Sequence, residues 1–180
     1  MTAYRLLQTL LAPGARRRLM EQSSACNQES GRRLDVGCGP DRLLNAVGVD
    51  IDFKRIAAYA RSGWPGVVAS ATALPFRDGT FGGVWSCGLL HHLNDEEARQ
   101  ALSEMRRVGR RTVVLDGVPP EPRWRRPVAA LIRRLDRGSW LRSEARLRAL
   151  AGEAWTCRRI TYSLTGLEGL VMEGSNADRR

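Results

Sequence analysis

Residues 34–40 read Leu34-Asp35-Val36-Gly37-Cys38-Gly39-Pro40, an apolar run that leads directly into a glycine turn. Because they lack a Cβ, Gly37 and Gly39 let the backbone turn sharply and approach a ligand closely. Asp35 is placed where a carboxylate orients the turn and accepts a hydrogen bond from an ammonium group. The stretch predicts a buried strand that ends in a ligand-binding turn, with a purely structural strand-to-helix turn as the alternative.

Short apolar runs alternate with helical segments after this turn. Further strands are predicted at 47–51, 66–69, 81–86 and 111–115. Helices are predicted between them at 53–61 and 95–108, the second capped by Asn94 or Asp95. This alternation indicates an α/β protein whose parallel sheet is covered by helices on both faces.

The segment before the first strand has a different pattern. Four leucines between residues 6 and 11 stand at helical spacing and predict an amphipathic helix over 2–12. Pro13-Gly14 ends that helix, and a polar linker or frayed helix follows from Glu21 to Gly31. The apolar stretch is too short and too interrupted for a membrane span, and it makes a poor signal peptide.

The segment after the fifth strand contains two more helices and two more strands. Pro127 opens a helix that ends at Gly138, a short helix covers 143–152, and two strands occupy 155–172. A chain of 180 residues suits a single domain. We expect three parts within it: an N-terminal helical cap and linker (1–30), a cofactor-binding half (33–116), and substrate-side helices with the final strands (117–172).

Chemistry-bearing residues stand at the carboxyl ends of these strands. In an open α/β sheet, ligands bind outside that edge. Asp50, at the tip of the second strand, is placed to accept both ribose hydroxyls of an adenosine. Its alternative role is that of a surface acid or a helix cap, although Asp52 is better placed for the cap.

Four motifs occur in order: LDVGCGP (34–40), VGVDID (47–52), ATALPFRDGTF (71–81) and GLLHHL (88–93). They resemble the successive motifs of class I S-adenosylmethionine-dependent methyltransferases, most closely the branch that methylates small molecules. The match covers about residues 33–116. The resemblance implies a Rossmann-like α/β fold with a mostly parallel twisted sheet of about seven strands, an antiparallel C-terminal strand pair, and helices on both faces.

The resemblance also implies a site for S-adenosylmethionine at the ends of the first four strands, made by Asp35, Gly37, Cys38, Gly39, Asp50, Ile51, Ser70, Ala71, Ser86 and Cys87. The turn at 37–39 would lie against the methionine part, Asp50 would bind the ribose, and Ile51 would lie against adenine. The pair 70–71 would reach the adenine edge. The pair 86–87 would line the cofactor near the reacting methyl.

Three positions depart from the family's pattern. Ser70 stands where an acidic residue often accepts the adenine amino group, and a hydroxyl accepts without charge assistance. Phe81-Gly82 replaces a common Phe-Asp pair. Asp41 stands where a third glycine is often found, and the first helix is confined to about 41–46. These departures bear on cofactor affinity more than on the fold, and they favour the alternative of a catalytically impaired accessory protein.

His91 and His92 are the candidate catalytic residues. An imidazole just after the fourth strand is suited to act as general base toward an acceptor hydroxyl, because its ordinary pKa lies near neutrality. The alternative is that one or both only hydrogen-bond backbone or fill the turn. Methyl transfer from a sulfonium needs mainly in-line placement, and a base is needed only if the acceptor must lose a proton.

Charge and cysteine content limit the partners. The formal net charge is +10, and all but one of the 29 basic residues are arginine, which indicates biased codon use more than a nucleic-acid or membrane-surface partner. Both partners stay open, but neither is favoured. The four cysteines show no metal-ligand spacing, so we expect no metal and a reducing, cytoplasmic location.

These observations predict a methyltransferase that transfers a methyl group from S-adenosylmethionine to a small-molecule acceptor. A dinucleotide-dependent dehydrogenase is less well supported, since its third glycine would fall at Arg42 and Asp50 comes too early for its acid. An RNA methyltransferase is also less favoured, because no Asn/Asp-Pro-Pro-Tyr/Phe motif follows the fourth strand. That motif is typical of amino-methylating nucleic-acid enzymes, so an RNA ribose target stays open.

Overall fold

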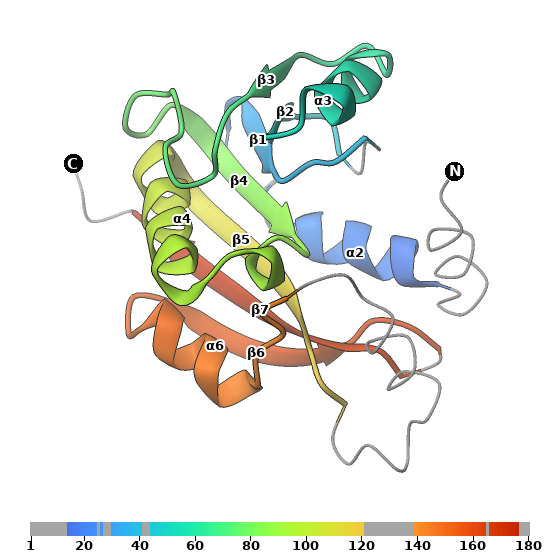
Figure 1. Ribbon diagram of the computed structural model, residues 1–180, viewed down its shortest axis with the longest axis vertical. Helices are drawn as coiled ribbons and strands as arrows, with labels where there is room; N and C mark the ends of the chain where they lie inside the picture. The colour runs from blue at the N-terminus through green and yellow to red at the C-terminus, as the bar shows by residue number, and fades with distance from the viewer. Residues whose placement is uncertain are drawn as a thin grey trace.

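A seven-stranded mixed sheet organises the protein (Figure 1). The computed structural model describes residues 14–24, 26, 30–40, 44–120, 139–164 and 166–176. The strands are β1 (Arg33–Val36), β2 (Val47–Asp50), β3 (Gly66–Val68), β4 (Phe81–Cys87), β5 (Gly109–Val118), β6 (Thr156–Thr161) and β7 (Glu168–Ser175). The helices are α2 (Ala15–Ser23), α3 (Phe53–Ala60), α4 (Asp95–Val108), α6 (Glu144–Ala151) and the short 3₁₀ helix η2 (Leu90–His92).

The strand order is β3-β2-β1-β4-β5-β7-β6. The first five strands pair in parallel, whereas β7 runs antiparallel to β5 and β6 runs antiparallel to β7. The chain leaves β1 toward β2 and β3 and then returns to β4 on the other side of β1. This switch point opens the crevice in which α/β proteins bind ligands, and the arrangement confirms the predicted fold class.

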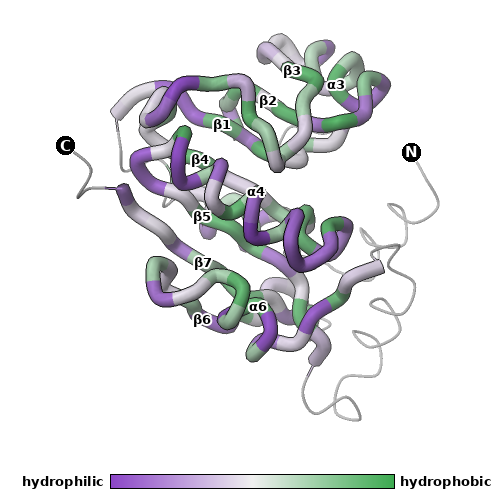
Figure 2. The backbone as a smooth tube through the Cα atoms, turned by 60° about the vertical axis from the view of Figure 1, so that its left-hand side comes forward, coloured by the Kyte–Doolittle hydropathy of each residue, from purple (hydrophilic) through white to green (hydrophobic). Residues whose placement is uncertain are grey.

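One face of the sheet carries the larger part of the core. In Figure 2, α4 and α6 lie side by side across this face. The buried residues of α4 recur at spacings of three and four, as a helix packed on a sheet requires; they are Ala98, Ala101, Leu102, Met105 and Val108. They pack with Leu34, Val84 and Val114 of the sheet and with Leu147 of α6.

The opposite face is covered at its two ends by α2 and α3. Leu19 of α2 packs with Trp85 and Val113, while Tyr59 of α3 lies over Gly48 of β2. A Cβ at Gly48 would come within 2.6 Å of the Tyr59 ring, so only glycine admits this ring. Helices therefore cover both faces, as predicted.

The structure corrects two boundaries. A helix occupies Ala15–Ser23, whereas the sequence predicts a linker or frayed helix that begins only at Glu21. Leu19 of this helix packs on the sheet, and tertiary packing of this kind outweighs weak local signals. Strand β5 extends over Gly109–Val118 rather than 111–115, because Gly109 pairs with Phe81 of β4 at one end and β7 pairs with β5 as far as Val118 at the other.

Several expected elements fall partly or wholly outside the described residues. The helices predicted at 2–12 and after Pro127 lie outside them, and of the segment 41–46 only 44–46 is described, as a bend rather than a helix. Across the described ranges, no helix combines the length and the apolar character needed to cross a membrane.

Candidate functional site

The glycine turn after β1 is tied to the end of β2. Gly37 and Gly39 both adopt left-handed backbone conformations, with φ of 73° and 61°. The backbone N–H groups of Gly37 and Cys38 donate to the Val49 carbonyl at 2.7 and 3.1 Å. The predicted turn and the predicted ribose acid therefore stand at the same edge of the sheet.

Asp50 connects the turn to the start of α3. Its carboxylate accepts hydrogen bonds from the backbone N–H of Gly39 at 3.1 Å and of Asp52 at 2.9 Å. Arg55 of α3 lies 3.6 Å from the same carboxylate. Asp52 is the N-cap of α3 and accepts from the Lys54 N–H, which is the role expected of it.

The two glycines have different surroundings. A Cβ at Gly37 would lie 3.0 Å from Cδ1 of Leu89, so packing and backbone conformation both require glycine there. Among the residues that the structure describes, which exclude 41–43, nothing lies within 4 Å of a Cβ built at Gly39. The outer side of the turn is thus open to a ligand that approaches the backbone closely.

Asp35 is a buried acid beside this turn. Burial, and secondarily the nearby charge of Asp50, raise the pKa of Asp35 to about 7. In register, Asp35 lies between Gly48 of β2 and Trp85 of β4. A cation placed near this carboxyl would relieve the cost of its ionisation.

The other predicted cofactor residues differ in exposure. Ile51 is 73% exposed and presents an apolar surface next to Asp50. The segment that contains Ser70 and Ala71 is held there by a hydrogen bond from Ala69 N–H to the Asp50 carbonyl. The Ser70 and Thr72 hydroxyls form a hydrogen bond with each other, and the Ser70 hydroxyl also accepts one from the Thr72 N–H.

The side chains of Ser86, Cys38 and Cys87, near the glycine turn, are buried or half-buried. Ser86 is fully buried, and its hydroxyl donates to the Val36 carbonyl at 2.8 Å, which joins β4 to β1. Cys38 lies against Gly48, and burial raises the pKa of its thiol. Cys87 is half-buried at the end of β4.

The two candidate histidines differ in burial and in their partners. His91 is buried, and its Nδ1 lies 2.7 Å from Oδ1 of Asp116, while its backbone N–H donates to Oδ2 of the same residue at 3.1 Å. His92 is exposed, with its ring centroid 4.3 Å from that of His91. Sequence reasoning did not select Asp116, although an acid at the end of a buried strand is the signal that identified Asp50.

Arg142 is a second residue near the histidines that the sequence analysis did not select. Its guanidinium is nearly buried and donates to the carbonyls of Leu90 and Leu93 at 2.7 and 2.6 Å, and to Asp95 at 2.8 Å. The Trp140 N–H donates to the His91 carbonyl. The segment before α6 therefore hydrogen-bonds to the turn that contains both histidines (residues 90–93). No local pattern in the sequence predicts these contacts.

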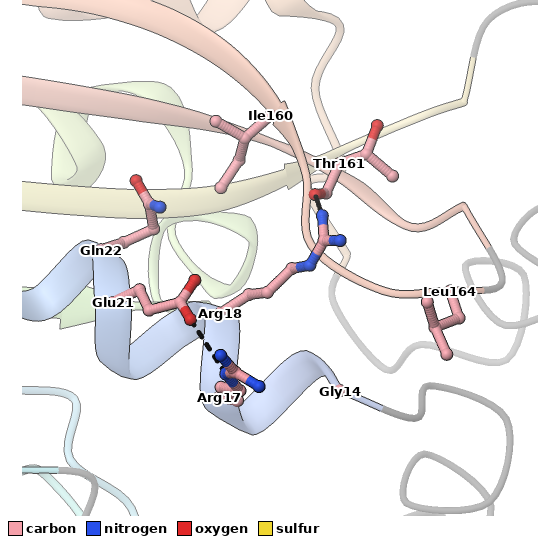
Figure 3. A pocket seen from close by; sticks show the side chains of 8 residues that line it. All are labelled: Gly14, Arg17, Arg18, Glu21, Gln22, Ile160, Thr161 and Leu164. Carbon is pink, nitrogen blue, oxygen red and sulfur yellow. Dashed lines mark hydrogen bonds and ion pairs between the residues drawn. The ribbon is translucent and has the colours of Figure 1, made fainter.

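An open cavity of about 750 Å³ lies elsewhere, between α2 and the end of β6 (Figure 3). Its lining comprises Gly14, Arg17, Arg18, Glu21, Gln22, Ile160, Thr161 and Leu164. Strand β6 is four strand positions from β1, roughly 19 Å at the usual inter-strand spacing. Arg17 pairs with Glu21, and Arg18 donates to the Thr161 carbonyl. This cavity is separate from the glycine turn.

A family model described as a methyltransferase domain matches residues 34–115. The matched span starts in β1 and ends in β5, so it contains the glycine turn, Asp50 and both histidines. The matched span is 82 of the 180 residues, somewhat less than half of the chain.

Solved structures share the Rossmann-like fold of this chain at low sequence identity. The PH0226 protein from Pyrococcus horikoshii OT3 is 20% identical with a TM-score of 0.67, and the match covers 89% of each chain. Magnesium protoporphyrin IX methyltransferase from Synechocystis PCC 6803, solved with bound SAM, is 15% identical with a TM-score of 0.60. That match covers 94% of this chain and 77% of the other.

A curated relative is similar over part of the chain. Probable tRNA methyltransferase 9B from Homo sapiens is 30% identical over 109 residues, which are 57% of this chain. The aligned part spans only 23% of the human protein's length.

Proposed function

We propose that the protein is an S-adenosylmethionine-dependent methyltransferase that acts on a small-molecule acceptor. The observation that carries the proposal is the junction of the open glycine turn with the Asp50 carboxylate, at the switch point between β1 and β4. The similarity to a methyltransferase of a porphyrin, solved with bound SAM, supports both the cofactor and the acceptor class.

The residues at this edge fit the cofactor. The open side of Gly39 would admit the methionine part of the cofactor. The Asp50 carboxylate would accept hydrogen bonds from the ribose hydroxyls, and the exposed Ile51 side chain would lie against the adenine ring. Asp35 is a buried acid whose ionisation a neighbouring ammonium group would favour. When bound, S-adenosylmethionine supplies a methyl group on a positively charged sulfur.

An RNA acceptor is the second candidate, because the human relative is described as a probable tRNA methyltransferase and the net charge is +10. A third candidate is an accessory protein that no longer catalyses transfer. We further propose a reducing, cytoplasmic location, since all four cysteines are free thiols.

Ligand titration tests the cofactor directly. S-adenosylhomocysteine should raise the melting temperature and bind in calorimetry, whereas NADH at equal concentration should do neither. Stabilisation by NADH alone would support a dehydrogenase and refute the proposal.

Labelled methyl donor then identifies the acceptor class. Incubation with a low-molecular-weight metabolite extract should label a small molecule, and incubation with purified total tRNA should not. Labelled tRNA would favour the second candidate, and cofactor binding without any transfer would favour the accessory protein.

A further inference from the structure

The segment that joins β3 to β4, residues 69–80, contains no helix or strand, and the structure describes every one of its residues. Its start is attached to the proposed ribose ligand, because the Ala69 N–H donates to the Asp50 carbonyl at 3.1 Å. The Ala73 N–H donates to the Ser70 carbonyl at 3.1 Å and closes a turn. Backbone without regular structure keeps one conformation only where other contacts offset its entropy. Further along the segment, those contacts come from α4.

Two side chains of α4, Glu104 and Arg107, bind the backbone of this segment. The Arg107 guanidinium donates to the Leu74 carbonyl at 3.0 Å and to the Phe76 carbonyl at 2.7 Å. The Glu104 carboxylate accepts the Leu74 N–H at 2.8 Å. Glu104 and Arg107 also pair with each other through hydrogen bonds of 2.6 and 2.8 Å. The planar fork of a guanidinium lets one arginine reach a carboxylate and two carbonyls at once.

This ion pair is partly shielded from water and reaches the end of the segment. The side chains of Arg107 and Glu104 are 28% and 19% exposed. The hydrogen bond from Arg107 is the main cause that lowers the pKa of Glu104, so the carboxylate stays ionised at neutral pH. Arg107 also lies 2.8 Å from the Asp78 carboxylate, and its carbonyl accepts the Gly79 N–H at 2.9 Å. Loss of the guanidinium would therefore remove three attachments of the segment at once.

The segment carries Ser70 and Ala71, the residues expected at the adenine edge of the proposed cofactor site. The Ser70 oxygen accepts the Thr72 N–H at 3.2 Å, and the Ser70 and Thr72 hydroxyls hydrogen-bond to each other at 2.8 Å. A hydroxyl can donate or accept, and the edge of adenine offers both an amino donor and ring-nitrogen acceptors. The two edges match only while the segment keeps its conformation.

We propose that Glu104 and Arg107 are positioning residues for recognition of the cofactor's base: from α4, they fix the segment 69–80 in the conformation that meets adenine. The proposal rests on the proposed function. Because the segment is ordered in the free protein, the base binds without a further ordering cost. Without Arg107, the segment must be ordered when the cofactor binds. The affinity for the base then falls, while the ribose and the homocysteine part keep their contacts with other elements.

Arg107→Gln tests the assignment, with Arg99→Gln as the matched control. Arg99 also lies on α4, where it pairs with Glu96 and donates to the Asp95 carbonyl, and these contacts lie within the helix. Two ligands separate the base from the rest of the cofactor: S-adenosylhomocysteine, and S-ribosylhomocysteine, which lacks adenine. If the wild type does not bind S-adenosylhomocysteine, the proposed function fails and this assignment fails with it. If it does bind, the comparison of the variants decides the assignment alone.

Calorimetry gives the first readout. The wild type should bind S-adenosylhomocysteine at least about 30-fold more tightly than S-ribosylhomocysteine. Arg107→Gln should weaken binding of S-adenosylhomocysteine about tenfold and that of S-ribosylhomocysteine less than about twofold, and Arg99→Gln should change neither. A general loss of stability would affect both ligands alike and leave the ratio of their affinities unchanged. An unchanged ratio in Arg107→Gln, or a wild-type ratio near one, would overturn the proposal.

Hydrogen exchange of the backbone amides gives the second readout. In the free wild type, the Leu74 and Gly79 amides should exchange slowly, because both donate to the pair on α4. In Arg107→Gln they should exchange at least about tenfold faster, while amides inside α4 keep their rates and saturating S-adenosylhomocysteine restores slow exchange at Leu74. If Arg107→Gln does not fold, Arg107→Lys, which keeps the charge but not the planar fork, should show the same changes at about threefold. Slow exchange at Leu74 in the free variant would overturn the proposal.

Discussion

Asp50, the proposed ribose ligand at the carboxyl edge, also has a structural role. Asp50 accepts the N–H groups of Gly39 and Asp52, so its carboxylate orders the turn before any ligand arrives. The proposed ribose contact is therefore preorganised, and preorganisation lowers the cost of binding.

Replacement of Asp50 by alanine should weaken S-adenosylhomocysteine binding. Loss of the buried acceptor should cost about 1–3 kcal/mol, which is about 5- to 150-fold in Kd measured by calorimetry. Asp52→Ala is the control: it removes the cap of α3 and about 1 kcal/mol of stability, but should leave Kd nearly unchanged. An Asp50→Ala protein with wild-type Kd would show that Asp50 is not the ribose ligand.

Asp35 should make the stability of the free protein fall with rising pH. Its folded pKa of about 7 exceeds that of an unfolded aspartate, near 4. Between these values the folded state keeps a proton that the unfolded chain has lost, so stability is highest at the acid end and levels off above pH 7. Chemical denaturation from pH 5 to 8 should show this slope in the wild type and a smaller slope in Asp35→Asn. Equal slopes would contradict the prediction.

At the scale of elements, the helix ends illustrate how local signals work. Asn94 and Glu97 form a capping box at the start of α4, and Ser143 caps α6. Both starts were predicted, because a cap acts over three residues of sequence. Helix α2 was not predicted, since its stability comes from packing on the sheet.

The contacts of buried Arg142 should contribute more to the unfolding free energy than the exposed ion pair of Arg146. Arg142 and Arg146 both pair with Asp95, but the Arg142 side chain is 5% exposed and that of Arg146 is 55% exposed. Arg142→Met should cost about 1–3 kcal/mol of unfolding free energy, because it leaves the Leu90 and Leu93 carbonyls without their buried donor, while Asp95 keeps its pair with Arg146. Arg146→Gln should cost less than about 1 kcal/mol. Similar losses in urea denaturation would show that Arg142 braces nothing.

At the scale of the whole molecule, Cys26, which precedes β1 in the chain, lies against β4 at a glycine. A Cβ at Gly83 of β4 would lie 2.3 Å from the Cys26 carbonyl oxygen, and the Cys26 thiol donates to the Val84 carbonyl. Burial raises the pKa of the Cys26 thiol to about 12, so this cysteine should react slowly with alkylating reagents.

Gly83→Ala should displace Cys26 from β4. The added methyl meets backbone rather than a flexible side chain, and such overpacking costs about 1–3 kcal/mol. Alkylation of Cys26, followed by peptide mass spectrometry, should become at least tenfold faster. Cys157, on distant β6, is the internal reference and should keep its rate. An unchanged Cys26 rate would mean that the segment tolerates the methyl group.

The sequence by itself determined the alternation of strands and helices, the glycine turn, and the meeting of that turn with Asp50. It could do so because the signals are local and because the carboxyl ends of parallel strands share one edge. Only the tertiary structure distinguished His91 from His92, since Asp116 lies 25 residues away on a neighbouring strand. The same holds for Arg142, whose contacts depend on where a distant segment returns to the sheet and on no spacing along the chain.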